Sequence, residues 1–77
     1  MEPKFEIRLD TLDFNDEHLQ AYLDHYEIKA ELVATQDNGI AEYAYYGTLS
    51  ELRDLVHEEF ANDEEEFVFL MSTVVQI

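Results

Sequence analysis

The chain has 77 residues, of which 19 are Asp or Glu and four are Lys or Arg, so its formal net charge is −15. A chain of this length forms one small domain, here residues 1–77, and the absence of Cys excludes disulfides and thiolate zinc sites. The charge argues against direct binding to nucleic acid or to an anionic membrane, because both depend on Lys and Arg to attract phosphate groups.

A folded domain is expected in spite of this charge, because 47 % of the residues are hydrophobic and they include five Phe and five Tyr. No apolar run approaches the roughly 18 residues that a membrane span needs, and the first residues contain no apolar signal segment. We therefore expect a cytoplasmic protein.

The first predicted element is a strand over residues 4–10, where Phe5, Ile7 and Leu9 alternate with charged residues. A helix is predicted after a polar connection, with Asn15 as its N-cap. The apolar face of that helix has helical spacing and consists of Leu19, Tyr22, Leu23 and Tyr26.

A period of two returns over residues 28–35 and predicts a second strand. The segment 36–39 ends in Asn38-Gly39, a pair that readily supplies the positive φ of a hairpin turn. A third strand is therefore predicted over residues 40–46, at hairpin distance from the second.

A second helix is predicted to begin at a capping box, in which Thr48 and Glu51 each satisfy a backbone N–H, and to end near Asn62. Residues 67–77 are apolar on both faces and predict a final strand. The order β-α-β-β-α-β is typical of an α+β, ferredoxin-like domain, with a four-stranded antiparallel sheet and two helices on one face.

The sequence contains no motif for a metal, a cofactor or catalysis. Residues 13–24 imitate a calcium loop, but the sixth position, where such loops need Gly, is His18. His18 and His25 lie about 10 Å apart along a helix, too far to share a zinc ion. Gly39 and Gly47 are the only glycines, and they form no phosphate-binding loop. We expect a binding protein that is not an enzyme.

The acidic residues form ridges on both predicted helices. A further acidic group lies at the C-terminal end of the second predicted helix and just after it: Glu58, Glu59 and residues 63–66. Negative charge there opposes the helix dipole, at a cost of about 0.3–1 kcal/mol for each residue close to the helix end. A local rule that is broken without structural gain often marks function. The alternative is that the acidic surface serves only solubility.

In bulk charge, size and lack of Cys the chain resembles phage-encoded nucleic-acid mimics that inhibit restriction or CRISPR nucleases. The resemblance lies in composition and involves no motif. It implies a partner protein with a basic, nucleic-acid-binding surface, approached at a salt-dependent rate. The expected contact residues are Glu51, Asp54, Glu58, Glu59, Asp63, Glu64, Glu65, Glu66, Asp13, Glu17, Asp24, Glu27 and Tyr46.

A second candidate surface is the sheet face opposite the helices. A final strand over residues 67–77 would place one apolar set there, which we take to include Leu70 and Val74. An open apolar face would suit an antidote-type or housekeeping interaction module, or a homodimer. The alternative is that the Leu12–Phe14 segment covers this face.

Overall fold

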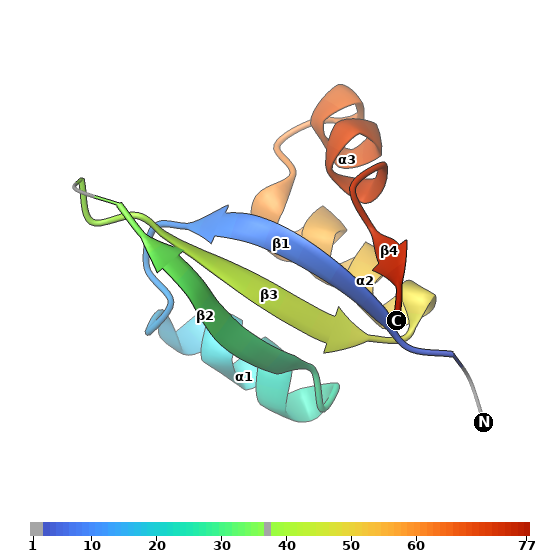
Figure 1. The fold of residues 1–77 in the computed structure, drawn as a ribbon, viewed down its shortest axis with the longest axis horizontal. Helices are drawn as coiled ribbons and strands as arrows, with labels where there is room; N and C mark the ends of the chain where they lie inside the picture. Colours follow the sequence, from blue (N-terminus) through green and yellow to red (C-terminus); the bar gives the residue numbers. More distant parts are fainter. Residues whose placement is uncertain (1–2, 37) are drawn as a thin grey trace.

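A computed structural model describes residues 3–36 and 38–77 and shows a mixed α+β chain (Figure 1). The elements follow one another as β1 (Phe5–Thr11), α1 (Glu17–His25), β2 (Lys29–Thr35), β3 (Ala41–Gly47), α2 (Leu49–Leu55), the π-helix η1 (Val56–Phe60), α3 (Glu64–Met71) and β4 (Val75–Gln76).

The four strands form one antiparallel sheet in the order β2-β3-β1-β4. β1 and β3 pair along their whole length, from Phe5 opposite Gly47 to Thr11 opposite Ala41. β4 pairs only with the first two residues of β1, so beyond Glu6 no described strand adjoins that edge of β1. The predicted α+β class and four-stranded antiparallel sheet are confirmed.

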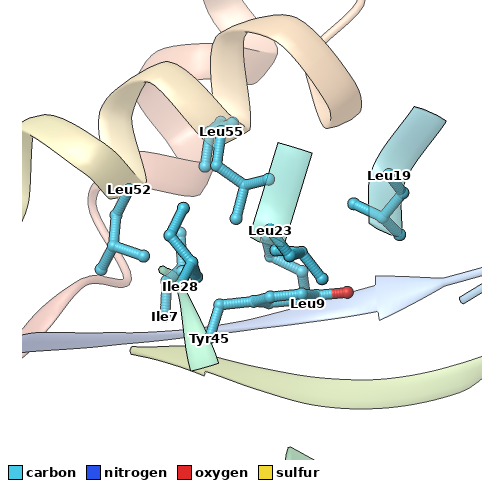
Figure 2. Close-up of a cluster of buried hydrophobic side chains, with 9 residues drawn as sticks. Ile7, Leu9, Leu19, Leu23, Ile28, Tyr45, Leu52 and Leu55 are labelled. Atoms are coloured by element: carbon cyan, nitrogen blue, oxygen red, sulfur yellow. The ribbon is translucent and has the colours of Figure 1, made fainter. Parts of the chain in front are cut away.

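The core lies between one face of the sheet and the two helices α1 and α2. Figure 2 shows leucines of both helices directed at Ile7, Leu9 and Tyr45 of the sheet. Tyr45 is fully buried, and its hydroxyl is 2.8 Å from that of Thr11. The buried cluster consists of Ile7, Leu9, Leu19, Leu23, Ile28, Tyr45, Leu52, Leu55 and Val56. The apolar alternation of β1 and the helical spacing of the leucines therefore mark the core correctly.

The predicted final strand over residues 67–77 is wrong over most of its length. Residues 64–71 form α3, and only Val75 and Gln76 remain in β4. Asp63 caps α3, because its Oδ1 accepts a hydrogen bond from the Glu66 backbone N–H at 2.8 Å. The Glu66 carboxylate in turn accepts from the Asn62 backbone N–H at 2.9 Å. The first bond satisfies a donor in the first turn of α3, and the second ties the Glu66 side chain to the residue before the cap. Together they favour a helix where apolar content alone also allowed a strand.

The second helix also differs from its prediction. α2 begins at the predicted capping box, with Thr48 Oγ1 and Glu51 Oε1 both hydrogen-bonded to backbone N–H groups. It ends at Leu55, and the chain continues as η1, whose wider turn is closed by a bond from Ala61 N to Val56 O at 2.8 Å. The described residues thus contain a third α-helix and a π-helical turn that depart from a strict ferredoxin-like pattern.

The start of α1 and the β2–β3 hairpin turn are both set by short polar residues or Gly. The N-cap of α1 is Asp16 in place of the predicted Asn15, because Asp16 Oδ1 accepts from Leu19 N at 3.1 Å. In the hairpin between β2 and β3, Gly39 has φ +83°, as the predicted Asn38-Gly39 turn requires. The predicted turn also included Asp37, which lies outside the described residues.

The open face of the sheet carries charged side chains, because Glu6, Arg8 and Asp10 alternate with the buried residues of β1. Ala44, only 1 % exposed, stands opposite both Arg8 and Glu31 in the sheet register. The predicted apolar patch from residues 67–77 is not on this face: Leu70 belongs to α3 and Val74 precedes β4. Among the described helices, none has the length and apolar character to cross a bilayer.

Candidate partner-binding surface

Within the part of the chain that the structure describes, a contact between an imidazole and a carboxylate joins helix α1 to the α2–η1 segment. His18 Nδ1 of α1 lies 2.5 Å from Glu59 Oε1 of η1. The Glu59 side chain is 12 % exposed and that of His18 is 77 % exposed. Glu59 Oε1 is buried and accepts no hydrogen bond of regular geometry from the described residues, and the His18 imidazole is the polar group that lies against it. A hollow opens on each side of this contact.

The first hollow has a volume of about 390 Å³ and is lined by His18, Tyr22, Tyr26, Asp54 and Glu58. The rings of Tyr22, on α1, and Tyr26, the C-cap residue of that helix, are 4.7 Å apart. Burial, followed by the nearby Asp54 carboxylate, raises the pKa of Tyr22 from 10.0 to about 12. The wall of this hollow is therefore aromatic on one side and anionic on the other.

The second hollow, of about 300 Å³, lies where β1 leads into α1. Asp10, Asp13, Asp16 and Glu59 line it together with apolar side chains. Part of this acidity has a local structural use, because Asp13 accepts from Asn15 N at 3.2 Å and Asp16 caps α1. We call the two hollows and the His18–Glu59 contact between them the interhelical cleft. Its six carboxylates are Asp10, Asp13, Asp16, Asp54, Glu58 and Glu59.

Few cations neutralise this cleft. Within the described residues, Arg53 Nε lies 3.9 Å from Asp54, and His57 Nδ1 lies 3.6 Å from Glu58. All four side chains are more than half exposed, so water and salt screen both pairs. The cleft consequently keeps a negative potential that attracts cations.

The structure brings only part of the predicted acidic surface into the cleft. Asp13, Asp54, Glu58 and Glu59 line it. Glu17, Asp24 and Glu27 are exposed on α1 or just after it, outside the cleft lining. Glu51 is half-buried and engaged in the capping box of α2, where its Oε1 accepts from Thr48 N at 2.8 Å.

The interpretation of residues 63–66 as helix-opposing charge is wrong. Asp63 is the N-cap of α3, and Glu64, Glu65 and Glu66 form its first turn. Negative charge at a helix N-terminus is stabilising by about 0.3–1 kcal/mol per group. These four carboxylates therefore stabilise the start of α3, and their positions do not by themselves indicate a function.

Tyr46 lies away from the cleft. It stands opposite Glu6 in the register of β1 and β3, on the open face of the sheet. Desolvation, followed by the Glu6 carboxylate, raises the pKa of Tyr46. A partner bound in the cleft would not reach this ring, because the sheet separates the two surfaces.

Asp10, Asp16 and His18 line the cleft although the sequence did not predict them as partner-binding residues, and Tyr22 and Tyr26 were predicted only as part of the apolar face of the first helix. The spacing of Tyr22 and Tyr26 was read correctly, but spacing cannot show that a second helix leaves an anionic hollow beside them. No three His, Asp or Glu side chains of residues 3–36 and 38–77 gather closely enough to hold a metal ion.

Comparisons of the chain with known protein families, with curated proteins and with solved structures found no match.

Proposed function

We propose that this protein is a small acidic binding protein that presents the interhelical cleft to a basic surface of a partner protein. The observation that carries the proposal is that six carboxylates line the cleft, while the described cations beside it are few and exposed. Steering by such a field speeds association with a cationic surface and weakens as salt is added.

The first hollow suits the side chain of an Arg or Lys. Its head group would lie between Asp54 and Glu58 and against the faces of Tyr22 and Tyr26. Such a contact combines ion pairing with cation–π attraction, which contributes about 0.5–2 kcal/mol depending on desolvation. The two carboxylates stand four residues apart, close to one helical turn.

In its sharper form the proposal is that the protein inhibits a nucleic-acid enzyme by occupying its phosphate-binding surface. Carboxylates one helical turn apart are separated by roughly 5–6 Å, of the same order as the spacing of phosphates along a nucleic-acid strand. We also propose that the scaffold is a ferredoxin-like sheet in which α3 has replaced most of the last strand.

The test is to immobilise the protein, capture partners from a cell lysate, and elute in parallel with duplex DNA, with RNA and with salt. The variant Glu58→Lys is compared with Glu31→Lys. Both substitutions raise the net charge by two units at exposed positions, but Glu58 lines the cleft and Glu31 lies on β2 with its side chain on the open face.

We expect to capture a nucleic-acid-binding protein and to release it with DNA or RNA. The Glu31→Lys variant should still capture this partner, whereas the Glu58→Lys variant should not. Equal loss in both variants would show that total charge, and not the cleft, drives binding. Capture that survives high salt and is indifferent to Glu58→Lys would reject the proposal.

A further inference from the structure

Helix α3 carries more apolar surface than the rest of the chain covers. Five consecutive residues, Phe67 to Met71, are apolar, and a helix that is apolar all round is normally buried all round. None of its residues is fully buried, and Val68 and Phe69 are 59 % and 68 % exposed. Phe67, Leu70 and Met71 pack against the core, so the uncovered part is the side that carries Phe69.

A groove of about 390 Å³ lies between α3 and the edge of β1. Its apolar lining consists of Leu9, Phe60, Leu70 and the exposed ring of Phe69. The volume is within the range of roughly 300–1,000 Å³ that is usual for ligand pockets. One extended peptide segment with a single apolar side chain would fit such a space better than a globular surface.

Among residues 3–36 and 38–77, no strand pairs with the edge of β1 beside this groove. β4 pairs with Phe5 and Glu6 only, whereas Arg8, Leu9 and Asp10 line the groove. Figure 1 shows β4 as a short arrow at one end of β1, with α3 beyond it. An unpaired strand edge is a template for a further strand, and main-chain hydrogen bonds supply affinity in that mode of recognition.

The charges around the groove indicate the chemistry of the occupant. Asp10, Glu42 and Glu66 line it together with one cation, Arg8. The Arg8 Nε is 3.1 Å from Glu6 Oε1, so part of its charge is already paired. A second copy of this chain, at −15, would bring like charges together, whereas a segment rich in Lys or Arg would be attracted.

We propose that an extended, basic segment of a partner protein adds to the free edge of β1 and inserts an apolar side chain between α3 and β1. The site differs from the interhelical cleft, although Asp10 and Phe60 line both. One basic partner therefore has two adjoining places to bind, the cleft for its folded basic surface and the groove for a flanking segment.

The test uses a synthetic heptapeptide of alternating Lys and Val, followed by NMR and amide hydrogen exchange on the intact protein. We expect added protection of β1 amides between Arg8 and Thr11, and shifts at Phe69 and Leu70. A peptide with Ser in place of Val keeps the charge, and an N-methylated peptide keeps the side chains but removes backbone donors. Both controls are expected to bind at least about tenfold more weakly.

The variant Phe69→Ser is compared with Val68→Ser. Both residues are exposed apolar positions of α3, but only Phe69 lines the groove. We expect at least about a tenfold loss of affinity for Phe69→Ser, as for an interface anchor, and less than about twofold for Val68→Ser. Circular dichroism checks that α3 persists in each variant.

Equal effects of the two variants, unchanged exchange of the β1 amides, or equal binding of the N-methylated peptide would overturn the proposal. The proposal would also be overturned if the protein had the mass of a dimer in solution and Phe69→Ser made it monomeric, since a second copy would then cover α3. Glu58→Lys separates the two sites, because it is expected to abolish capture through the cleft while leaving heptapeptide binding nearly unchanged.

Discussion

The imidazole of His18 and the carboxylate of Glu59 meet at 2.5 Å across the outer side of the two helices, although they are 41 positions apart in the sequence. Glu59 is largely buried, whereas His18 is largely exposed. The contact therefore places an exposed imidazole over a carboxylate that has lost most of its water, and it divides the interhelical cleft into its two hollows.

Replacing His18 with Ala is expected to lower the free energy of unfolding by about 1 kcal/mol, because the Glu59 carboxylate then stays buried without the polar imidazole beside it. Glu59→Gln in the His18→Ala background is expected to recover most of the loss, since a neutral amide costs less to bury. Urea denaturation at one fixed pH and salt concentration measures both. A double variant that is less stable than His18→Ala alone would contradict this role.

Replacing Asp63 with Ala is expected to destabilise α3 locally by about 1 kcal/mol, because the Glu66 backbone N–H loses its acceptor. Amide exchange should increase in residues 64–71 before it changes in β1 or β3. Glu65→Gln is the control, since it changes the charge of the same turn without touching the cap. Uniform destabilisation of the whole domain would show that α3 unfolds only with the sheet.

Replacing Glu27 with Gly is expected to stabilise the protein by about 1 kcal/mol. Glu27 has φ +55° just after α1, in the left-handed region that Gly adopts without steric cost. Its negative charge near the helix C-terminus is a smaller, separate cost. Glu27→Gln removes the charge and keeps the side chain, so the difference between the two variants isolates the backbone contribution. A Gly variant no more stable than the Gln variant would refute the backbone argument.

Alkaline pH is expected to destabilise the fold through two tyrosines. Burial raises the pKa values of Tyr22 and Tyr45 from 10.0 to about 12, because the folded state favours the neutral phenols. The corresponding stability is fully present below pH 10 and is lost as the pH rises from about 10 to about 12. Urea denaturation across this range measures the loss. Tyr22→Phe and Tyr45→Phe should each make the free energy of unfolding less dependent on pH. If neither variant changes this dependence, groups other than the two tyrosines cause it.

β1, α1 and α2 were predictable because each of them has one buried face. Ile7 and Leu9 alternate with charged residues in a strand, and Leu19 and Leu23 are one helical turn apart, so the period of the pattern identified the element. The cap of α2 was predictable for a different reason, since Thr48 and Glu51 satisfy each other locally whatever the rest of the chain does.

The cleft was only partly predictable. Carboxylates on the outer sides of two helices follow from the pattern, which is why Asp54 and Glu58 were expected at the surface. The approach of His18 to Glu59, and the hollow beside Tyr22, depend on how closely two distant segments pack on the same sheet. No local signal encodes that distance.

The sequence by itself determined the acidic character, the α+β class, the hairpin turn and the leucines of the core. The amino-acid composition gives the charge, and the spacing of apolar residues shows which side of an element is buried. Only the tertiary structure decided the fate of residues 64–77. Residues 67–77 are apolar on both faces, so their pattern could not choose between a helix and a strand. The cap formed by Asp63 and the packing of Phe67, Leu70 and Met71 against the core favour a helix, and the edge of β1 that a full strand would have covered is left open.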